Sequence, residues 1–189
     1  MNVPPLPRQR FPVPTHTIRL LTPDDANAYT ILRREMLADS PWAFLRSPQD
    51  DPGCNAAGLM TSLSKPTGFA IAAAFAHDQP TTPVAVAGIV RSEPIKAAHR
   101  ALIWGVYTSP THRGHGLARS IIAAAIEAAR AWPVTPRVDC FTLSVSEKST
   151  AAYGLYLSMG FVPWGTEPDA VRLGDGKPGY AEVHMQLRA

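Results

Sequence analysis

Cysteine is scarce in this chain of 189 residues, which contains only Cys54 and Cys140 and no Cys-x-x-Cys pair. That scarcity argues against a disulfide framework, a structural zinc site and a thioredoxin-like redox motif. Two isolated thiols are typical of a protein whose cysteines stay reduced. We therefore expect a cytoplasmic protein without a metal site.

Clustered positive charge and long apolar runs are also missing. Eighteen Lys and Arg against fifteen Asp and Glu give a net charge of only +3, and the only adjacent basic pair is Arg33-Arg34. The sequence thus has no basic tail or stripe of the kind that binds nucleic acid. No apolar run reaches the length of a membrane span, and no stretch has the pattern of a signal peptide. We expect neither a nucleic-acid partner nor a membrane partner.

Proline, by contrast, is concentrated at the start of the chain, where residues 1–15 contain five. Such a segment favours an extended, polyproline-like tail outside the folded body. With 46% hydrophobic and 17% charged residues, the remainder can bury a sizeable core. Residues 16–189 therefore fit a single globular domain.

Apolar periodicity and turn residues predict the helices and strands. Strands are expected at 16–21, 68–77, 83–93, 100–110 and 137–146, with two more in 161–188, and helices at 26–40, 55–65, 116–132 and 149–160. The predicted buried face of the first helix has Ala28, Ile31, Leu32 and Glu35 with Met36 close by, and that of the third has Leu117, Ile121, Ile122, Ala125 and Ile126. This order indicates a mixed α/β (α+β) fold, with a largely antiparallel sheet and helices on its faces.

The stretch TSPTHRGHGLARS, residues 108–120, joins a predicted strand to a predicted helix. We expect Arg113 to Leu117 to form the first turn of that helix, where backbone N–H groups lack internal partners and the helix dipole is positive. Gly114 and Gly116 leave the backbone open, and this turn holds no Ser, Asp or Asn to cap it. The turn therefore predicts a site for an anion, above all a phosphate or diphosphate.

Two familiar phosphate-binding motifs do not fit this stretch. A P-loop requires the pattern GxxxxGK[ST], which is absent. A dinucleotide fingerprint requires a third glycine where Arg119 stands, together with an alternating parallel βαβ context. The third alternative is the acyl-coenzyme A turn of acetyltransferases.

Two landmarks resemble the GNAT superfamily of N-acetyltransferases over residues 16–188. The segment from Arg113 to Ala118, RGHGLA, matches the coenzyme A signature Q/R-x-x-G-x-G/A of that family. The second landmark, N-x-x-A-x-x-L-Y-x-x-x-G-F, is matched at Ala152, Leu155, Tyr156, Gly160 and Phe161, with Ser149 in the place of Asn. The resemblance implies a twisted, mostly antiparallel sheet of about seven strands, with helices on both faces and a splay between the fourth and fifth strands.

The resemblance also implies that acetyl-CoA lies between those two strands as co-substrate. Its diphosphate would lie on the N–H groups of residues 114–119, and its arm would run along GVYTS, residues 105–109, as an added strand would. The implied cofactor-binding residues are Val106, Tyr107, Thr108, Arg113, Gly114, His115, Gly116, Leu117, Ala118, Arg119 and Ser149. Ser149 also stands where a helix N-cap belongs. Gly105, unusual inside a strand, indicates either a β-bulge or a plain kink.

Tyr156 is the candidate catalytic acid, because a phenol can protonate a leaving thiolate of comparable pKa. A backbone N–H between Val106 and Thr108 is the candidate group that polarises the thioester carbonyl. The base stays open among Glu35, Asp39 and Glu93, each of which could equally be a solvated carboxylate. Trp42 and Phe44 line either the acceptor mouth or the core. His112 and His115 have no third ligand nearby in the sequence, and Arg113 between them disfavours a cation.

The sequence thus predicts an N-acetyltransferase that moves an acetyl group from acetyl-CoA to a primary amine by direct attack. The acceptor is a small molecule or a peptide, and a homodimer is left open. The alternative is a non-catalytic module that senses acyl-CoA, which would need the RGHGLA turn but no acid.

Overall fold

The computed structural model describes residues 16–174 and 178–188, so the proline-rich segment 1–15 lies outside the described residues. The elements are β1 (His16–Leu20), α1 (Ala26–Asp39), α2 (Ala56–Leu63), β2 (Phe69–Ala76), β3 (Pro83–Arg91), β4 (Arg100–Thr108), α3 (Leu117–Ala131), β5 (Cys140–Ser146), α4 (Thr150–Ser158), β6 (Val162–Val171) and β7 (Tyr180–Arg188). Their order is the one that the sequence predicts. Within the part of the chain described, no helix is both long and apolar enough to cross a bilayer.

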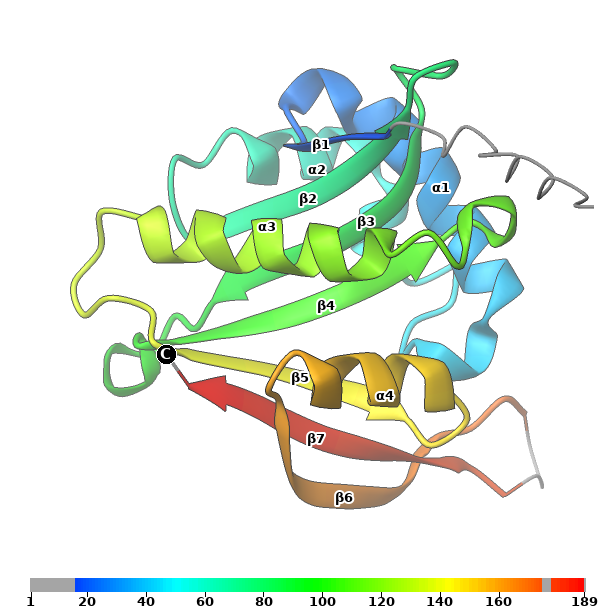
Figure 1. Cartoon of the computed structure of the whole chain (residues 1–189), viewed down its shortest axis with the longest axis vertical. Helices are drawn as coiled ribbons and strands as arrows, with labels where there is room; N and C mark the ends of the chain where they lie inside the picture. Colours follow the sequence, from blue (N-terminus) through cyan, green and yellow to red (C-terminus); the bar gives the residue numbers. More distant parts are fainter. Residues whose placement is uncertain (1–15, 175–177, 189) are drawn as a thin grey trace, which may run out of the picture.

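One seven-stranded sheet organises the molecule, with the strand order β1-β2-β3-β4-β5-β7-β6 (Figure 1). Its neighbouring strands are antiparallel except β4 and β5, which run parallel. That parallel pair extends only from Arg100 opposite Cys140 to Leu102 opposite Thr142. Beyond Leu102 the two strands part, which confirms the predicted splay.

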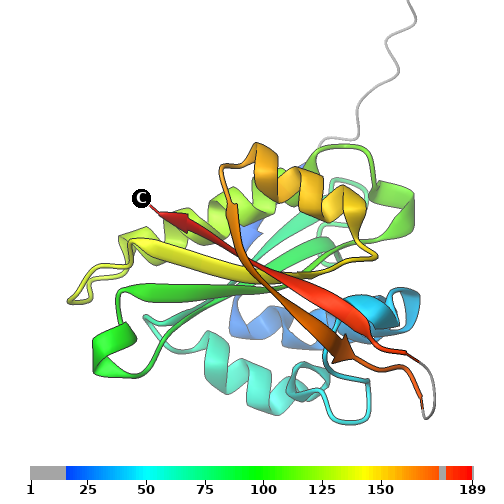
Figure 2. The same cartoon turned by 90° about the horizontal axis from the view of Figure 1, so that it is seen from below.

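The sheet separates two apolar layers. Helices α1 and α2 cover one face, and α3 and α4 cover the other (Figures 1 and 2). Side chains of β2 alternate between the layers, since Ala72 and Ala74 belong to the cluster under α3, whereas Ile71 and Phe75 belong to the cluster under α1. Both faces of β2 are covered, which explains why its sequence is apolar throughout.

The two long helices differ in how well their buried faces can be predicted. In α3 all the predicted positions are buried: Leu117, Ile121, Ile122, Ala125 and Ile126. In α1 the prediction is only partly confirmed: Leu32 and Met36 are buried, but Ile31 is 67% exposed and Glu35 is exposed, while Tyr29 and Arg33 join the buried face instead. The physical reason is a buried ion pair: Arg33 donates to Asp51 at 2.5 Å, so a charged residue belongs to the apolar stripe.

A β-bulge interrupts β4 at Gly105, as one of the two sequence interpretations expects. Gly88 pairs with Trp104 and Val86 with Tyr107, so Gly105 and Val106 together oppose Ala87. The extra residue changes the alternation of side chains: Ile103 and Val106 pack toward α3, whereas Trp104 and Tyr107 pack toward α1. The bulge bends β4 just after its ladder with β5 ends.

Gly105 has φ +60°, and a Cβ added there would lie 2.9 Å from the Arg33 Nη1 atom. We expect Gly105→Ala to lower the free energy of unfolding by about 1–3 kcal/mol, because it combines backbone strain with a clash against a buried cation. Gly58→Ala in α2 is the control, since a Cβ there makes only ordinary contact with Asn55. Urea denaturation of both variants measures the difference, and equal stabilities would contradict the role given to Gly105.

Candidate functional site

The parted strands border three adjoining cavities. The central cavity, about 80 Å³, lies between β4 and β5 and is lined by Ile103, Val106, Leu143, Ser144 and Tyr156 among others. The α4-side cavity, about 260 Å³, reaches Thr108, Arg113, Ala118 and Leu155. The sheet-face cavity, about 330 Å³, reaches Arg33, Trp104, Ser144 and Glu182. Phe44 lines all three, so the loop after α1 lies across the opening in the sheet.

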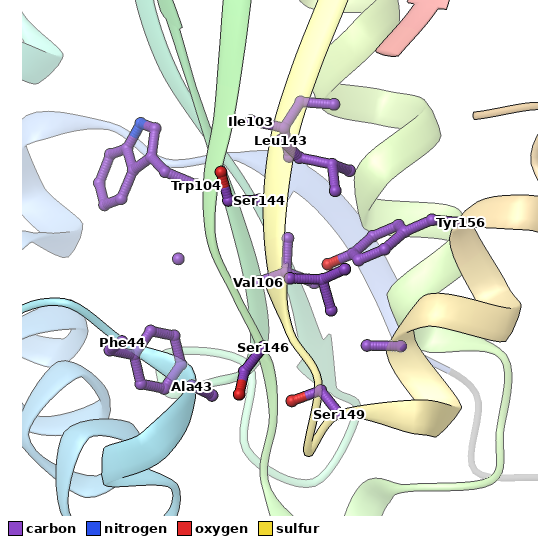
Figure 3. A pocket seen from close by; sticks show the side chains of 13 residues that line it. Ala43, Phe44, Ile103, Trp104, Val106, Leu143, Ser144, Ser146, Ser149 and Tyr156 are labelled. Atoms are coloured by element: carbon purple, nitrogen blue, oxygen red, sulfur yellow. The ribbon is translucent and has the colours of Figure 1, made fainter. Parts of the chain in front are cut away.

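Tyr156 projects from α4 toward the parted strands, and Figure 3 shows its hydroxyl pointing toward Val106. The residue is only 5% exposed, and its ring packs edge-on against Phe161 at 5.9 Å. Burial raises the pKa of the phenol to about 12. Tyr156 therefore keeps its proton throughout the neutral range, in contact with both the central and the α4-side cavities.

The predicted helix turn is shorter than the sequence suggests. Helix α3 begins at Leu117, and Gly116 is its N-cap at φ +74° with no side-chain capping bond. Arg113 and Gly114 lie before the helix, because Gly114 at φ +80° turns the chain in a left-handed conformation that a helix does not contain. Only the N–H groups from Leu117 onward belong to the first turn, and the side chain of Leu117 is buried in the core.

The two predicted arginines lie near this turn but have protein partners. Arg113 donates to an Asp39 carboxylate oxygen at 2.5 Å and to the Thr108 carbonyl at 3.0 Å. Arg119 donates to the Ser158 hydroxyl at 2.6 Å, which ties the start of α3 to the end of α4. Both guanidinium groups lie on exposed residues, where a ligand anion can exchange with these partners.

The histidines of the turn contact the backbone and the His16 ring. A nitrogen of His115 lies 3.2 Å from the His112 carbonyl, and the His112 ring lies edge-on to that of His16. Within residues 16–174 and 178–188, no group of three or more His, Cys, Asp and Glu side chains is placed to hold a metal ion. The turn presents its backbone and two arginines.

The end of β4 presents three different side chains to the site. Val106 lines the central cavity, between Phe44 and Tyr156. The Tyr107 hydroxyl donates to Glu35 at 3.2 Å, and burial followed by the Glu35 charge raises the pKa of the phenol. Among the polar side-chain atoms of the described residues, Thr108 Oγ1 is buried without a hydrogen-bond partner, and this residue lines the α4-side cavity.

Ser149 occupies the N-cap position of α4, but its side chain makes no capping hydrogen bond. The residue lines both the central and the α4-side cavities. Its hydroxyl points away from α4, toward the side of Ser146 (Figure 3). Helix capping therefore does not occupy the Ser149 hydroxyl, and the side chain is available to a ligand.

The three candidate bases lie away from the parted strands. Asp39 pairs with Arg113, whose hydrogen bond holds the pKa of that carboxyl below its usual range. Glu35 accepts from Tyr107. Glu93 is exposed and follows β3 beside the end of β4 that is paired with β5. The described residues that line the three cavities include none of these carboxylates.

Sequence reasoning missed Glu182, which is only 6% exposed and lines the sheet-face cavity. Burial raises the pKa of its carboxyl group. The signal for it was the period-two pattern of β7, in which Glu182, His184 and Gln186 alternate with apolar residues. That pattern gives β7 a polar face on the side where α1 and α2 leave the sheet uncovered (Figure 2).

The sheet-face cavity has aromatic and charged walls. Trp104 and Phe44 lie on the opposite side of the parted strands from Tyr156 (Figure 3). Phe44 lines the cavities and also packs against the core under α1, so it fits both interpretations of its loop, whereas Trp42 is not among the described residues that line the cavities. The Arg33 guanidinium lies 5.5 Å from the Phe44 ring centroid and 5.6 Å from that of Trp104. A ligand here meets a surface different from the α4-side cavity.

The α4-side cavity and the turn before α3 together offer groups that suit an anionic ligand. A Cβ at Gly114 or Gly116 would meet no atom within 4 Å, so the glycines leave open space beside the uncapped N-terminus of α3. Arg113 and Arg119 supply positive charge at the same place. The buried Thr108 hydroxyl and the uncapped Ser149 hydroxyl offer polar contacts farther along. The residues present therefore match the chemistry of the co-substrate.

Comparison of the chain with known protein families identifies one matching family. Residues 29–161 match the model of the acetyltransferase (GNAT) family. No curated protein sequence matches the chain significantly. Among solved structures, a GNAT-family acetyltransferase from Streptococcus pneumoniae is similar, with 18% identity, a TM-score of 0.75, and coverage of 93% of this chain and 100% of that one.

Two further structures share the fold. The acetyltransferase yncA from Salmonella typhimurium, solved with its cofactor acetyl-CoA, has 19% identity and a TM-score of 0.74, covering 92% of this chain and 94% of its own. A ribosomal-protein-alanine N-acetyltransferase from Brucella melitensis has 21% identity and a TM-score of 0.73. The match covers 92% of this chain and 99% of that one. At these identities the likeness supports the fold and leaves the acceptor open.

Gly116→Trp should weaken the binding of coenzyme A by about 100-fold, because the indole would cover the N-terminus of α3 and remove charge-assisted hydrogen bonds. Gly68→Trp is the matched control: Gly68 also has positive φ, +85°, with no atom within 4 Å of an added Cβ, but it precedes β2. Titration calorimetry with coenzyme A measures both. Equal affinities in the two variants would show that the diphosphate binds elsewhere.

Proposed function

The chain belongs to the GNAT family of acetyltransferases, which use acetyl-CoA, and on this premise we propose that it acetylates a primary amine by direct attack. Acetyl-CoA supplies an acetyl group activated as a thioester. The observation that carries the proposal is the Tyr156 hydroxyl, which points into the gap where β4 and β5 part. A proton donor there lies between the α4-side cavity and the sheet-face cavity, where a co-substrate and an acceptor would meet.

Tyr156 is proposed as the acid that protonates the leaving sulfur. Its pKa of about 12 exceeds the value of about 10 for a free phenol and of about 8.5 for a free thiol. The same burial raises the pKa of a thiol that forms beside it, so the two groups stay close in acidity. The phenol is therefore protonated when the reaction begins and donates only as negative charge develops.

The backbone of β4 is proposed to stabilise the negative charge on the carbonyl oxygen. From Ile103 onward β4 has no ladder partner on the β5 side among the described residues. The bulge at Gly105 turns the backbone at this point. Backbone groups near Val106 are thus free to contact a ligand, and N–H groups fixed in a sheet need no reorganisation as charge develops.

The diphosphate is proposed to bind at the N-terminus of α3, between Arg113 and Arg119. The backbone of Gly114, His115, Gly116, Leu117 and Ala118 would contact the diphosphate. Ser149 would contact the arm of the co-substrate, which would run along Val106 to Thr108. Residues 16–189 would form the catalytic domain. A cytoplasmic location and a homodimer remain predictions.

A thiol-release assay with acetyl-CoA and a panel of primary amines tests the proposed function. The panel should contain amino acids, aliphatic and aromatic amines, and peptides with free N-termini or lysines. Acetylation of at least one class, confirmed by the mass of the product, is expected. If coenzyme A binds but no amine in a broad panel releases thiol, the chain is the non-catalytic acyl-CoA sensor instead.

Tyr156→Phe should lower kcat by about 100-fold, because the ring stays packed while the proton donor is lost. The dissociation constant of acetyl-CoA should change by less than about threefold, since the phenol acts on the leaving group. Tyr153→Phe on the same helix is the control, because Tyr153 packs against the core without lining the cavities. Undiminished kcat in Tyr156→Phe would remove this residue as the acid.

A further inference from the structure

Three polar side chains form a hydrogen-bonded chain on the sheet face that α1 and α2 leave uncovered. Ser144 on β5 has its Oγ atom 2.7 Å from Nδ1 of His184 on β7. The other ring nitrogen of His184, Nε2, lies 3.2 Å from an oxygen of Glu167 on β6. The chain thus runs across three adjacent strands, from the central cavity outward.

The sheet itself holds these groups in place. Ser144 lies opposite His184 in the β5–β7 ladder, and Glu167 lies opposite Glu182 in the β6–β7 ladder. The Trp164 ring stacks on the His184 ring, with 5.3 Å between centroids and 23° between planes. Strand register and stacking therefore fix both the position and the plane of the imidazole.

The direction of the hydrogen bonds follows from the chemistry of the three groups. An ionised Glu167 can only accept, so the His184 Nε2 atom must carry the hydrogen that it shares with the carboxylate. In a neutral imidazole the Nδ1 atom is then an acceptor, and the Ser144 hydroxyl donates to it. The lone pairs of Ser144 Oγ remain free to accept a hydrogen from another group.

Ser144 is the member of the chain that reaches the site. It lines both the central cavity, together with Tyr156, and the sheet-face cavity, together with Trp104. Ser144 is exposed, and Leu143 and Val145 on either side of it point to the opposite face of the sheet. Its hydroxyl therefore lies on the acceptor side of the parted strands, across them from the proposed acid.

We propose that Ser144, His184 and Glu167 form the proton relay that deprotonates the acceptor amine. The inference rests on the proposed function and supplies the base that it lacks. As the amine attacks, its N–H bond breaks and the proton goes to Ser144 Oγ, while the Ser144 proton goes to His184 Nδ1. The imidazolium that results is stabilised by the Glu167 carboxylate and later releases its proton to water.

The charges around His184 favour this transfer. Glu167 faces the His184 ring from β6, and Glu182 interacts with the ring from β7, the strand that also carries His184. Both carboxylates stabilise an imidazolium, and so does the indole face of Trp164. Glu182 itself is a competing base, because it lines the sheet-face cavity. In that alternative the proton would bypass Ser144.

Steady-state kinetics test the relay with acetyl-CoA and the primary amine of the panel that releases thiol fastest. Ser144→Ala and His184→Gln should each lower kcat/KM for the amine by about 100-fold at pH 7. The loss should shrink at high pH, where hydroxide replaces the relay. Ser144→Thr, which keeps the hydroxyl, should retain most of the activity, and acetyl-CoA affinity should not change. Ser64→Ala and His77→Gln are controls on exposed residues that line none of the three cavities of the site.

The outcomes separate the relay from the function. If the wild type acetylates an amine and Ser144→Ala keeps the wild-type rate and pH profile, the relay is wrong while the function stands. If only Glu182→Gln lowers kcat/KM for the amine, Glu182 is the base. Independently of turnover, nitrogen-15 NMR of His184 tests the hydrogen-bond pattern that the relay requires. A proton on Nε2 with Nδ1 unprotonated supports it, and a neutral ring protonated on Nδ1 overturns it.

Discussion

The short ladder between β4 and β5 is the constraint on which the site depends. These strands pair only as far as Leu102 opposite Thr142 and then part. A sheet that is otherwise continuous therefore has one opening in its middle. Gly105 lies just beyond the last pair, and its bulge bends β4 away. Glycine adopts the positive φ at that residue without a steric penalty, whereas a Cβ there would clash with Arg33, which is itself held by Asp51.

The opening divides the chemistry between two faces. On the face covered by α3 and α4, uncapped backbone N–H groups and two arginines suit an anion, and Tyr156 keeps its proton because it is buried. On the other face, Phe44, Trp104 and the polar side chains of β5 and β7 border a separate cavity. A thioester and an amine approaching from opposite faces would meet between the strands, with an acid on one side and a base on the other.

The uncovered part of the sheet explains why polar residues gather there. Helices α1 and α2 pack over β2, β3 and β4, and no described α-helix covers the same face of β5, β7 and β6 (Figure 2). Side chains that point outward from these strands meet solvent and one another, so Ser144, His184 and Glu167 can form hydrogen bonds across neighbouring strands. A polar stripe is stable here and would be costly under a helix.

The sequence by itself determined the order of elements, the buried face of α3, and the glycine-rich turn before it, because apolar periodicity and glycine placement are local signals. It also indicated Tyr156, through a motif contained in one helix and its end. It did not determine the buried face of α1, because the partner of Arg33 is Asp51 in a later loop. Nor did it place Ser144, His184 and Glu167 together, since they lie on three strands whose neighbourhood follows from the order β5-β7-β6. Only the tertiary structure decided these contacts, because register and strand order bring distant residues within hydrogen-bonding distance, and no local pattern encodes that distance.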